Sequence, residues 1–336
     1  MKKIYTYLFA LIAVVSVSCE KTGMGSYTDV GLVPEGGYIR FSTKVSTKAP
    51  LLTNLRENSF GILGYEYNYS TNWESARVLA KPTVFYDEKI VCDEDGVCTY
   101  DPLKPWNLTK KYAFFAYYPQ PGNNGITISS ESKTDTPTIS YALPLSDNPV
   151  LPEKMCDLMT AYAVNETAGG GTVGLTFQHK LFCIDVLAQN YNDTQESISK
   201  LTLTIDNLKY QGITLPLKND EGTTVVYDEI EDNNNGYQFR LIGDSDDTVT
   251  VNKADGQVNM SEDKIMLIPQ NEGIKGTIAI TFEGDNNAQV YAFDFTKEMK
   301  EGRKYNLIIN FTGNTIVIAN AEAESWDSWN VEHEFE

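Results

Sequence analysis

The feature that most constrains the fold of this chain is an alternation of apolar and polar residues with a period of two. Successive side chains of a β-strand point to opposite faces, so an alternating run predicts a strand with one buried face. Turn residues such as Gly, Asn and Asp separate the short runs, and many strands of this kind predict an all-β sandwich or barrel. The clearest runs are Ile39–Val45, Leu201–Ile205, Ile278–Phe282, Tyr291–Phe295 and Tyr305–Phe311.

One apolar stripe changes phase within a single stretch. Leu175, Phe177, His179 and Leu181 occupy one phase, whereas Ile184 and Val186 occupy the other. A shift by one residue moves every following side chain to the opposite face. The sequence therefore predicts a bulge or a bend near Phe182, in a strand that passes between two sheets.

The beginning of the chain predicts export. Lys2 and Lys3 precede an apolar run that ends at Val17, which is typical of a signal peptide and too short for a membrane span. The following Cys19 resembles the acylated cysteine of a bacterial lipobox, although Ser16 stands where an aliphatic residue is usual. We therefore expect a signal peptide over 1–18, a lipid on Cys19 and a flexible tether over 19–37. The alternative is an ordinary secretory signal followed by an unrelated cysteine.

A glycine-rich break divides the rest of the chain. Without its leader the chain has about 318 residues, a length that favours two domains. The segment 165–172 contains three consecutive glycines, Gly169 to Gly171. We expect an N-terminal domain over 38–168 and a C-terminal domain over 172–336.

The charge of the chain excludes one class of partner. There are 27 Lys and Arg residues against 46 Asp and Glu, which gives a formal net charge of -19. Such a surface repels phosphate backbones, so we expect no binding of nucleic acid.

Five cysteines are present, and four remain if Cys19 carries a lipid. Cys92 and Cys98 flank an acidic turn whose Asp-Gly step favours a tight hairpin, so a disulfide across that hairpin is expected. Cys156 and Cys183 are the remaining pair. They form either a second bridge or free thiols, and Cys183 lies in an apolar strand where a buried thiol also fits.

Recognisable catalytic and metal-binding patterns are missing from the sequence. The two histidines, His179 and His333, do not supply the converging ligands of a zinc site, and no Gly-x-Ser-x-Gly nucleophile elbow occurs. The acidic loops at Asp93–Asp95 and Asp244–Asp247 do not match the calcium-binding loop of an EF-hand. We expect no enzyme activity, no metal and no cofactor. A hydrolase with carboxylates dispersed along the sequence remains an open alternative.

Several stretches, taken in order, resemble the fimbrillin-like proteins of Bacteroidota. That resemblance implies two β-sandwich domains of transthyretin-like, Greek-key topology without an active site. The stretches are the lipobox and tether followed by the strand Tyr38–Val45, then Trp106 with the aromatic run Lys111–Pro119, Lys154–Met159, Leu175–Leu181, and Gly302–Leu307 with Ile316–Ile318 and Trp326.

The resemblance also implies a mode of assembly. Polymerising subunits of the family are exported as lipoproteins and cut after a basic residue, which removes the first strand and opens an apolar groove for a strand of a neighbouring subunit. The candidate processing residues here are Arg40, Lys44, Lys48 and Arg56. Anchor subunits of the family keep their lipid and remain uncut.

The expected function is therefore that of a fimbrial subunit or fimbria-associated surface lipoprotein in pilus assembly and cell adhesion. Its expected partners are other fimbrial subunits, the outer membrane through the lipid anchor, and a receptor on a host or bacterial surface. A glycan-binding outer-membrane lipoprotein of a polysaccharide-uptake system is the alternative function. In that case we would expect exposed aromatic platforms, because aromatic rings buried in a strand fill a core instead.

Overall fold

The computed structural model of the chain describes residues 35–45, 55, 58–77, 81–120, 125–129, 136–218, 224–231, 236–243, 248–261 and 263–325, with the backbone alone at 320–325. These residues fall in one compact unit and are mostly strands, which confirms the all-β prediction. The described helical segments are short: α1 (Trp73–Ala76) and the 3-10 turns η1 (Pro152–Lys154), η2 (Ala168–Gly170) and η3 (Lys253–Asp255). None of the described helices is both long and apolar enough to cross a membrane.

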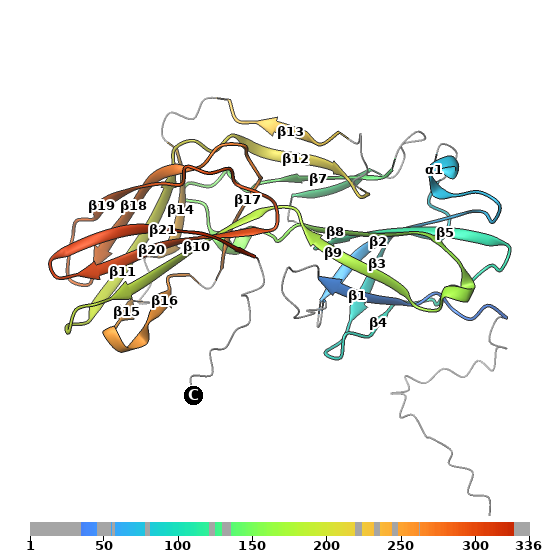
Figure 1. The fold of residues 1–336 in the computed structure, drawn as a ribbon, viewed down its shortest axis with the longest axis horizontal. Coiled ribbons are helices and arrows are strands. Elements are labelled where there is room, and N and C mark those ends of the chain that lie inside the picture. Colours follow the sequence, from blue (N-terminus) through green and yellow to red (C-terminus); the bar gives the residue numbers. More distant parts are fainter. Residues whose placement is uncertain are drawn as a thin grey trace, which may run out of the picture. The chain divides into compact units, whose positions relative to one another are not determined.

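The first sheet closes on itself as a barrel of strands (Figure 1). Its strand order is β1-β4-β3-β2-β5-β8-β9, and the closure is a parallel pairing of β1 with β9. The strands are β1 (Phe41–Val45), β2 (Ser59–Asn68), β3 (Phe85–Cys92), β4 (Cys98–Thr99), β5 (Lys110–Tyr118), β8 (Met159–Glu166) and β9 (Val173–His179).

Two further sheets follow in the second half of the chain. One has the order β16-β10-β20-β21 with β17 also on β10, and the other has the order β14-β11-β18-β19 with β15 also on β11. Their strands are β10 (Phe182–Asn190), β11 (Glu196–Ile205), β14 (Tyr237–Ile242), β15 (Val249–Val251), β16 (Gln257–Asn259), β17 (Ile265–Leu267), β18 (Lys275–Phe282), β19 (Gln289–Asp294), β20 (Arg303–Thr312) and β21 (Thr315–Ser325).

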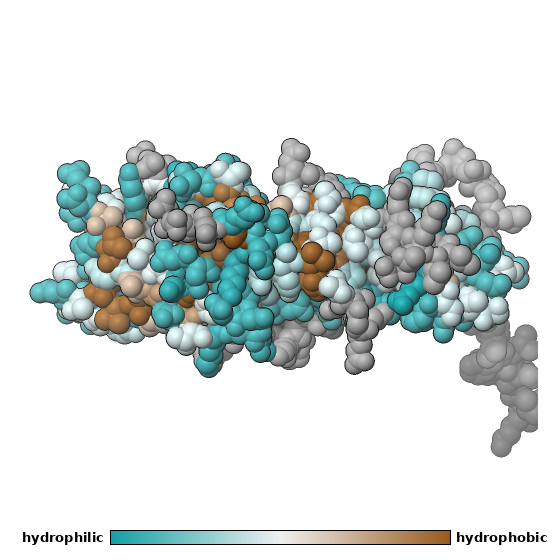
Figure 2. Space-filling view, turned by 90° about the horizontal axis from the view of Figure 1, so that it is seen from above, coloured by the Kyte–Doolittle hydropathy of each residue, from teal (hydrophilic) through white to brown (hydrophobic). Residues whose placement is uncertain are grey.

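A fourth sheet, β13-β12-β7-β6, joins segments that are far apart in the sequence. It pairs β6 (Ile126–Ser129) and β7 (Thr138–Ala142) with β12 (Tyr210–Pro216) and β13 (Val226–Glu229). This sheet lies at the top of Figure 1 and on the side that faces the viewer in Figure 2, where brown apolar patches interrupt a largely teal surface. Val226 and Tyr227 on its edge strand β13 are exposed.

Buried apolar residues form two clusters. The one that we call the N-terminal core contains only residues between Ile39 and Phe177, whereas the shared core runs from Leu63 to Phe311. Strand β5 contributes to both, with Phe114 in the N-terminal core and Phe115 in the shared core. This explains its nearly continuous aromatic sequence, and it confirms that the run fills a core. The N-terminal core consists of Ile39, Phe41, Val45, Leu55, Phe60, Ile62, Phe85, Ile90, Cys92, Cys98, Tyr100, Trp106, Tyr112, Phe114, Ala116, Met159, Ala161, Ala163, Val173, Leu175 and Phe177.

The predicted change of phase marks the passage between sheets. Strand β9 ends at His179 in the first sheet, and β10 begins at Phe182 in another, so the predicted bend is confirmed. The division into domains at 168 and 172 remains a proposal, as does the transthyretin-like topology. Strand β9 pairs with β1 and β8, and the shared core takes residues from both halves.

Candidate functional site

The candidate site is the strand β1 and the surface on which it lies. Alternate residues of this strand are buried, because Phe41, Thr43 and Val45 point into the barrel while Ser42 and Lys44 are exposed. Ile39, directly before the strand, is also fully buried. The alternation in the sequence thus corresponds to one buried face of β1, which fills part of the N-terminal core.

Phe41 lies at the centre of this buried face. Its ring lies 5.3 Å from that of Phe114, 5.5 Å from that of Phe85 and 6.0 Å from that of Tyr100, measured between centroids. The contacts with Phe114 and Phe85 have edge-to-face geometry, which adds to the free energy gained from burial alone. An aromatic residue in a strand near one end of the fold therefore contacts rings from three other segments.

The backbone of β1 is paired unequally on its two sides. Five residues are in register with β9, from Phe41 opposite Val173 to Val45 opposite Phe177, whereas β4 contributes only the pair of Phe41 and Cys98. The Tyr100 hydroxyl donates a hydrogen bond to the Ile39 carbonyl oxygen at 2.8 Å. Strand β1 is thus held mainly by one neighbour and by its buried side chains.

The basic residues proposed for processing fall into two groups. Arg40 and Lys44 are exposed, and the Arg40 carbonyl oxygen accepts a hydrogen bond from the Val173 amide at 2.8 Å. Lys48 and Arg56 lie outside the described residues, as does Cys19. The sites beyond β1 and the lipidation site therefore remain predictions.

A disulfide joins Cys92 and Cys98 beside the candidate site. The turn between them is closed by the Asp93 carboxylate, which accepts hydrogen bonds from the amides of Asp95 at 3.0 Å and Val97 at 2.8 Å. Asp93 thus has a structural role in the turn. Among the described residues, no group of three or more His, Cys, Asp or Glu side chains is placed to hold a metal ion.

The other two described cysteines, Cys156 and Cys183, are free thiols and not a second bridge. Burial raises the pKa of the Cys156 thiol to about 12, and burial also raises the pKa of Cys183. His179 is buried with its Nδ1 2.8 Å from a carboxylate oxygen of Asp157. These groups are satisfied within the fold and do not form a nucleophilic site.

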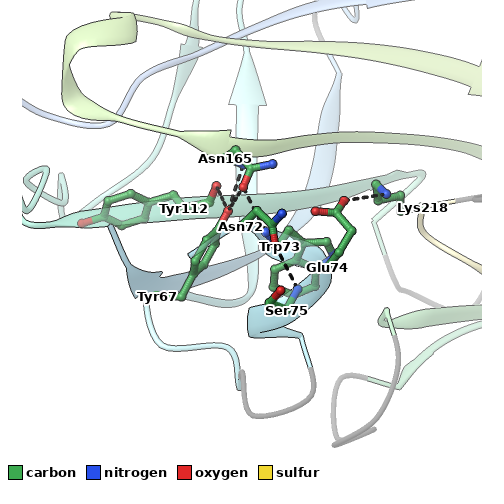
Figure 3. A network of polar contacts seen from close by, with 8 residues as sticks. All are labelled: Tyr67, Asn72, Trp73, Glu74, Ser75, Tyr112, Asn165 and Lys218. Carbon is green, nitrogen blue, oxygen red and sulfur yellow. Dashed lines mark hydrogen bonds and ion pairs between the residues drawn. The ribbon is translucent and has the colours of Figure 1, made fainter. Parts of the chain in front are cut away.

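Asn165 is a structural residue that the sequence alone did not reveal. It has a positive φ of 63° at the end of β8, and its side-chain oxygen accepts hydrogen bonds from the Tyr67 hydroxyl at 2.9 Å and the Trp73 amide at 3.0 Å (Figure 3). It thereby fixes α1 against β2 and β8. Burial raises the pKa of Tyr67 to about 12, so this hydroxyl remains a donor at neutral pH. The one available signal was that Asn tolerates left-handed backbone better than most residues.

The helix α1 is held from two more sides in the same view. Its N-terminal cap is Asn72, whose side-chain oxygen accepts a hydrogen bond from the Ser75 amide at 3.2 Å. Glu74 forms an ion pair with Lys218 at 3.5 Å, which ties the first half of the chain to the end of β12. The network thus fixes the position of α1 relative to strands of both halves of the chain.

The fold and the site together define a class of all-β protein whose first sheet is completed by a strand near the beginning of the described chain. The model of the fimbrillin-like family matches residues 49–326. The chain belongs to the fimbrillin-like family.

Solved structures share this fold. A fimbrial protein from Bacteroides vulgatus is 20% identical with a TM-score of 0.59, covering 85% of this chain and 99% of that one. A protein from Bacteroides ovatus, whose name proposes a role in cell adhesion, is 14% identical with a TM-score of 0.53 and covers 86% of this chain and 97% of its own. At these identities the likeness concerns the fold. No curated protein sequence matches the chain.

Proposed function

We propose that this protein is a fimbrial subunit or fimbria-associated surface lipoprotein that acts in pilus assembly by strand exchange and in cell adhesion. Membership of the fimbrillin-like family supports the fimbrial role. The proposal includes no catalytic step. It includes other fimbrial subunits as partners, a receptor on a host or bacterial surface, and attachment to the outer membrane through a lipid on Cys19.

The burial of β1 is the observation that carries the proposal. Removing the strand would uncover the part of the N-terminal core that Ile39, Phe41 and Val45 fill, and it would leave β9 with an unpaired edge. An exposed apolar groove beside an open strand edge favours addition of another strand, with the backbone providing affinity and alternate side chains filling the pockets. The family match begins at residue 49, after β1.

The position of β1 favours two of the four basic residues as processing sites. A cut after Arg40 would leave all of β1 attached to β2, and a cut after Lys44 would fall inside the strand and leave Val45 attached. Proteases act best on exposed segments without backbone pairing, and Arg40 is already paired with Val173. A cut after Lys48 or Arg56 would release all of β1, so we propose cleavage at one of these two.

The first experiment determines the N-terminal residue and mass of the protein isolated from cells. A chain that begins directly after Lys48 or Arg56 identifies a polymerising subunit, and a chain that begins at acylated Cys19 identifies an anchor subunit. Electron microscopy of a deletion strain accompanies it. Unchanged fimbriae and unchanged attachment of the deletion strain would refute the proposal.

The second experiment tests strand exchange directly. A site for a specific protease replaces residues 47–50, the purified protein is cut, and a labelled peptide of residues 38–45 is added in excess. We expect the peptide to replace β1, with binding followed by fluorescence anisotropy. A peptide carrying Phe41→Asp should not bind, whereas Ser42→Asp places the same charge on the exposed side of β1 and should bind. Equal binding of the two variants would refute the proposed groove.

A further inference from the structure

A pocket lies at the end of the later sheets where three turns meet. The turns connect β10 to β11, β18 to β19 and β20 to β21, and the pocket between them has a volume of about 700 Å³. The β20–β21 turn is the red loop at the left of Figure 1. This volume is within the range of sites that bind small molecules. No residue of β1 lines the pocket, so the site is separate from the proposed strand exchange.

Hydrogen bonds between turns fix the walls of the pocket. The Asn192 side chain accepts a hydrogen bond from the Gly313 amide at 2.6 Å and donates one to the Gly313 carbonyl oxygen at 3.1 Å. The Glu283 amide donates to the Ser197 carbonyl oxygen at 2.9 Å. The β10–β11 and β20–β21 turns are thereby joined to each other, and the β18–β19 turn is joined to strand β11. A site whose walls are already fixed loses little entropy when a ligand binds.

The lining combines aromatic rings with uncharged and acidic polar groups. Phe282 and Tyr291 are partly exposed, whereas Phe311, whose ring centroid lies 6.0 Å from that of Phe282, is buried in the shared core. The Tyr291 hydroxyl donates to the Gln289 side-chain oxygen at 2.6 Å. The side chains of Gln195, Glu283 and Asn314 form no hydrogen bond with other described residues, so they can bond to a ligand. Amide and carboxylate oxygens accept hydrogen bonds from hydroxyl groups, and aromatic faces contact C–H surfaces.

The charges of the lining exclude other ligand classes. Glu196, Glu283 and Asp285 are acidic, and none of the described lining residues is Lys or Arg, so a phosphate or a carboxylate would be repelled. The described residues also offer no group of three His, Cys, Asp or Glu side chains for a metal ion. A neutral molecule with many hydroxyl groups and apolar C–H faces can pack its C–H faces against the rings and donate hydrogen bonds to the acceptors.

We infer that this pocket binds a short neutral oligosaccharide. The inferred site gives the chain a receptor-binding surface at the β20–β21 end of the later sheets. Gln289 and Tyr291 point to the same side of β19 because they are two residues apart, and both line the pocket. Val290 between them is exposed and does not line it, so this position provides a matched control.

The test is a glycan array with neutral and sialylated oligosaccharides, probed with the purified protein and followed by calorimetry on the strongest neutral glycan. We expect neutral glycans to bind and sialylated forms of the same glycans to bind more weakly. Tyr291→Ala and Gln289→Ala should each weaken binding by about tenfold, the effect of losing one contact of ordinary strength. Val290→Ala should leave the affinity unchanged.

Three results would overturn the inference. The first is the absence of binding to any neutral glycan, and the second is equal or tighter binding of the sialylated forms. The third is binding that Tyr291→Ala, Gln289→Ala and a Glu283→Gln variant all leave unchanged, since the glycan would then lie elsewhere. Unfolding curves of each variant show whether it is folded, and all three substitutions are at positions that are at least partly exposed.

Discussion

The N-terminal core and the later sheets are built from similar strands but are completed differently. In the N-terminal core, β1 lies between β4 and β9 and supplies Ile39, Phe41 and Val45. In the later sheets, the last described strand, β21, lies at an edge beside β20, and the central strands β10 and β11 come from the middle of the chain. The strand nearest the end of the described fold thus lies inside its sheet in the first region, whereas in the second region it lies at an edge.

This difference predicts that the chain can be opened at β1 without losing the rest of its fold. The N-terminal core is rich in aromatic residues and takes no residue from beyond Phe177. The shared core continues behind the first sheet and connects it to the later strands. Removal of β1 should therefore expose one core and leave the other packed.

The largest expected effect is that of Phe41→Ala. Loss of a fully buried aromatic ring typically destabilises a protein by about 3–5 kcal/mol, and Phe41 contacts three other rings. Chemical denaturation measures the change in the free energy of unfolding. Ser42→Ala, on the exposed side of the same strand, should change it by less than about 0.5 kcal/mol.

Hydrogen exchange on the Phe41→Ala protein tests whether the N-terminal core and the shared core unfold separately. Amides of β9 and β4 should lose protection, because they pair with β1. Amides of β11 and β18 should keep theirs, since these strands belong to the shared core alone. Equal loss of protection in all four strands would show that the two cores unfold as one.

The all-β fold and the change of sheet near Phe182 could be predicted because both depend on local alternation. Burial follows the period of two in β1 and β9, so the inward residues were readable from the sequence. The parallel closure of β1 with β9 was not readable, because the two strands are far apart in the chain and many pairings satisfy the same pattern.

Contacts between distant segments also could not be predicted, either around Asn165 or at the pocket. The glycine-rich stretch 165–172 predicted a break, yet Asn165 at its start fixes α1 through hydrogen bonds to Tyr67 and Trp73. The pocket arises from three turns that only the folded sheets bring together. Turn residues in a sequence indicate where strands end, but they do not indicate which turns become neighbours.

Gly61→Ala should have the next largest effect, because Gly61 lies in β2, which contributes residues to both the N-terminal core and the shared core. An added Cβ would lie 2.2 Å from the ring of Tyr117, which is fully buried and donates a hydrogen bond to Asp87. The ring cannot move away, so we expect a loss of about 3 kcal/mol, the upper end for overpacking. Thermal unfolding measures it.

Gly174→Ala in β9 is the matched control. It is also a strand glycine of the first sheet, and an added Cβ there meets no atom within 4 Å. The unfolding temperature should therefore stay constant or rise slightly. Unlike Phe41→Ala, Gly61→Ala should reduce the hydrogen-exchange protection of amides in both the first sheet and the later sheets. A change confined to the first sheet would mean that the shared core does not couple them.

Replacing both Cys92 and Cys98 by Ala should have a smaller effect. The disulfide closes a short loop, and loss of such a cross-link costs about 2 kcal/mol in the chain-entropy description. The effect should concentrate on β1, because Cys98 forms the pairing of β4 with Phe41. Displacement of β1 by the labelled peptide should accelerate in this variant. Reductant should reproduce the change in the parent protein and have no effect on the variant.

The smallest effect concerns the free thiols Cys156 and Cys183, which lie in or against the shared core. The pKa of Cys156 is raised by burial from 9.0 to about 12, so its thiolate is scarce at about pH 8 and neither thiol should react with a disulfide reagent until the protein unfolds. Because the folded form holds the proton more tightly, this contribution to stability is complete below pH 9.0 and is lost as the pH rises towards about 12. Labelling of the two thiols after release of β1 tests whether the shared core stays packed when the N-terminal core is opened. If opening the N-terminal core leaves the shared core packed, both thiols remain unreactive, and rapid labelling would show that the opening is global.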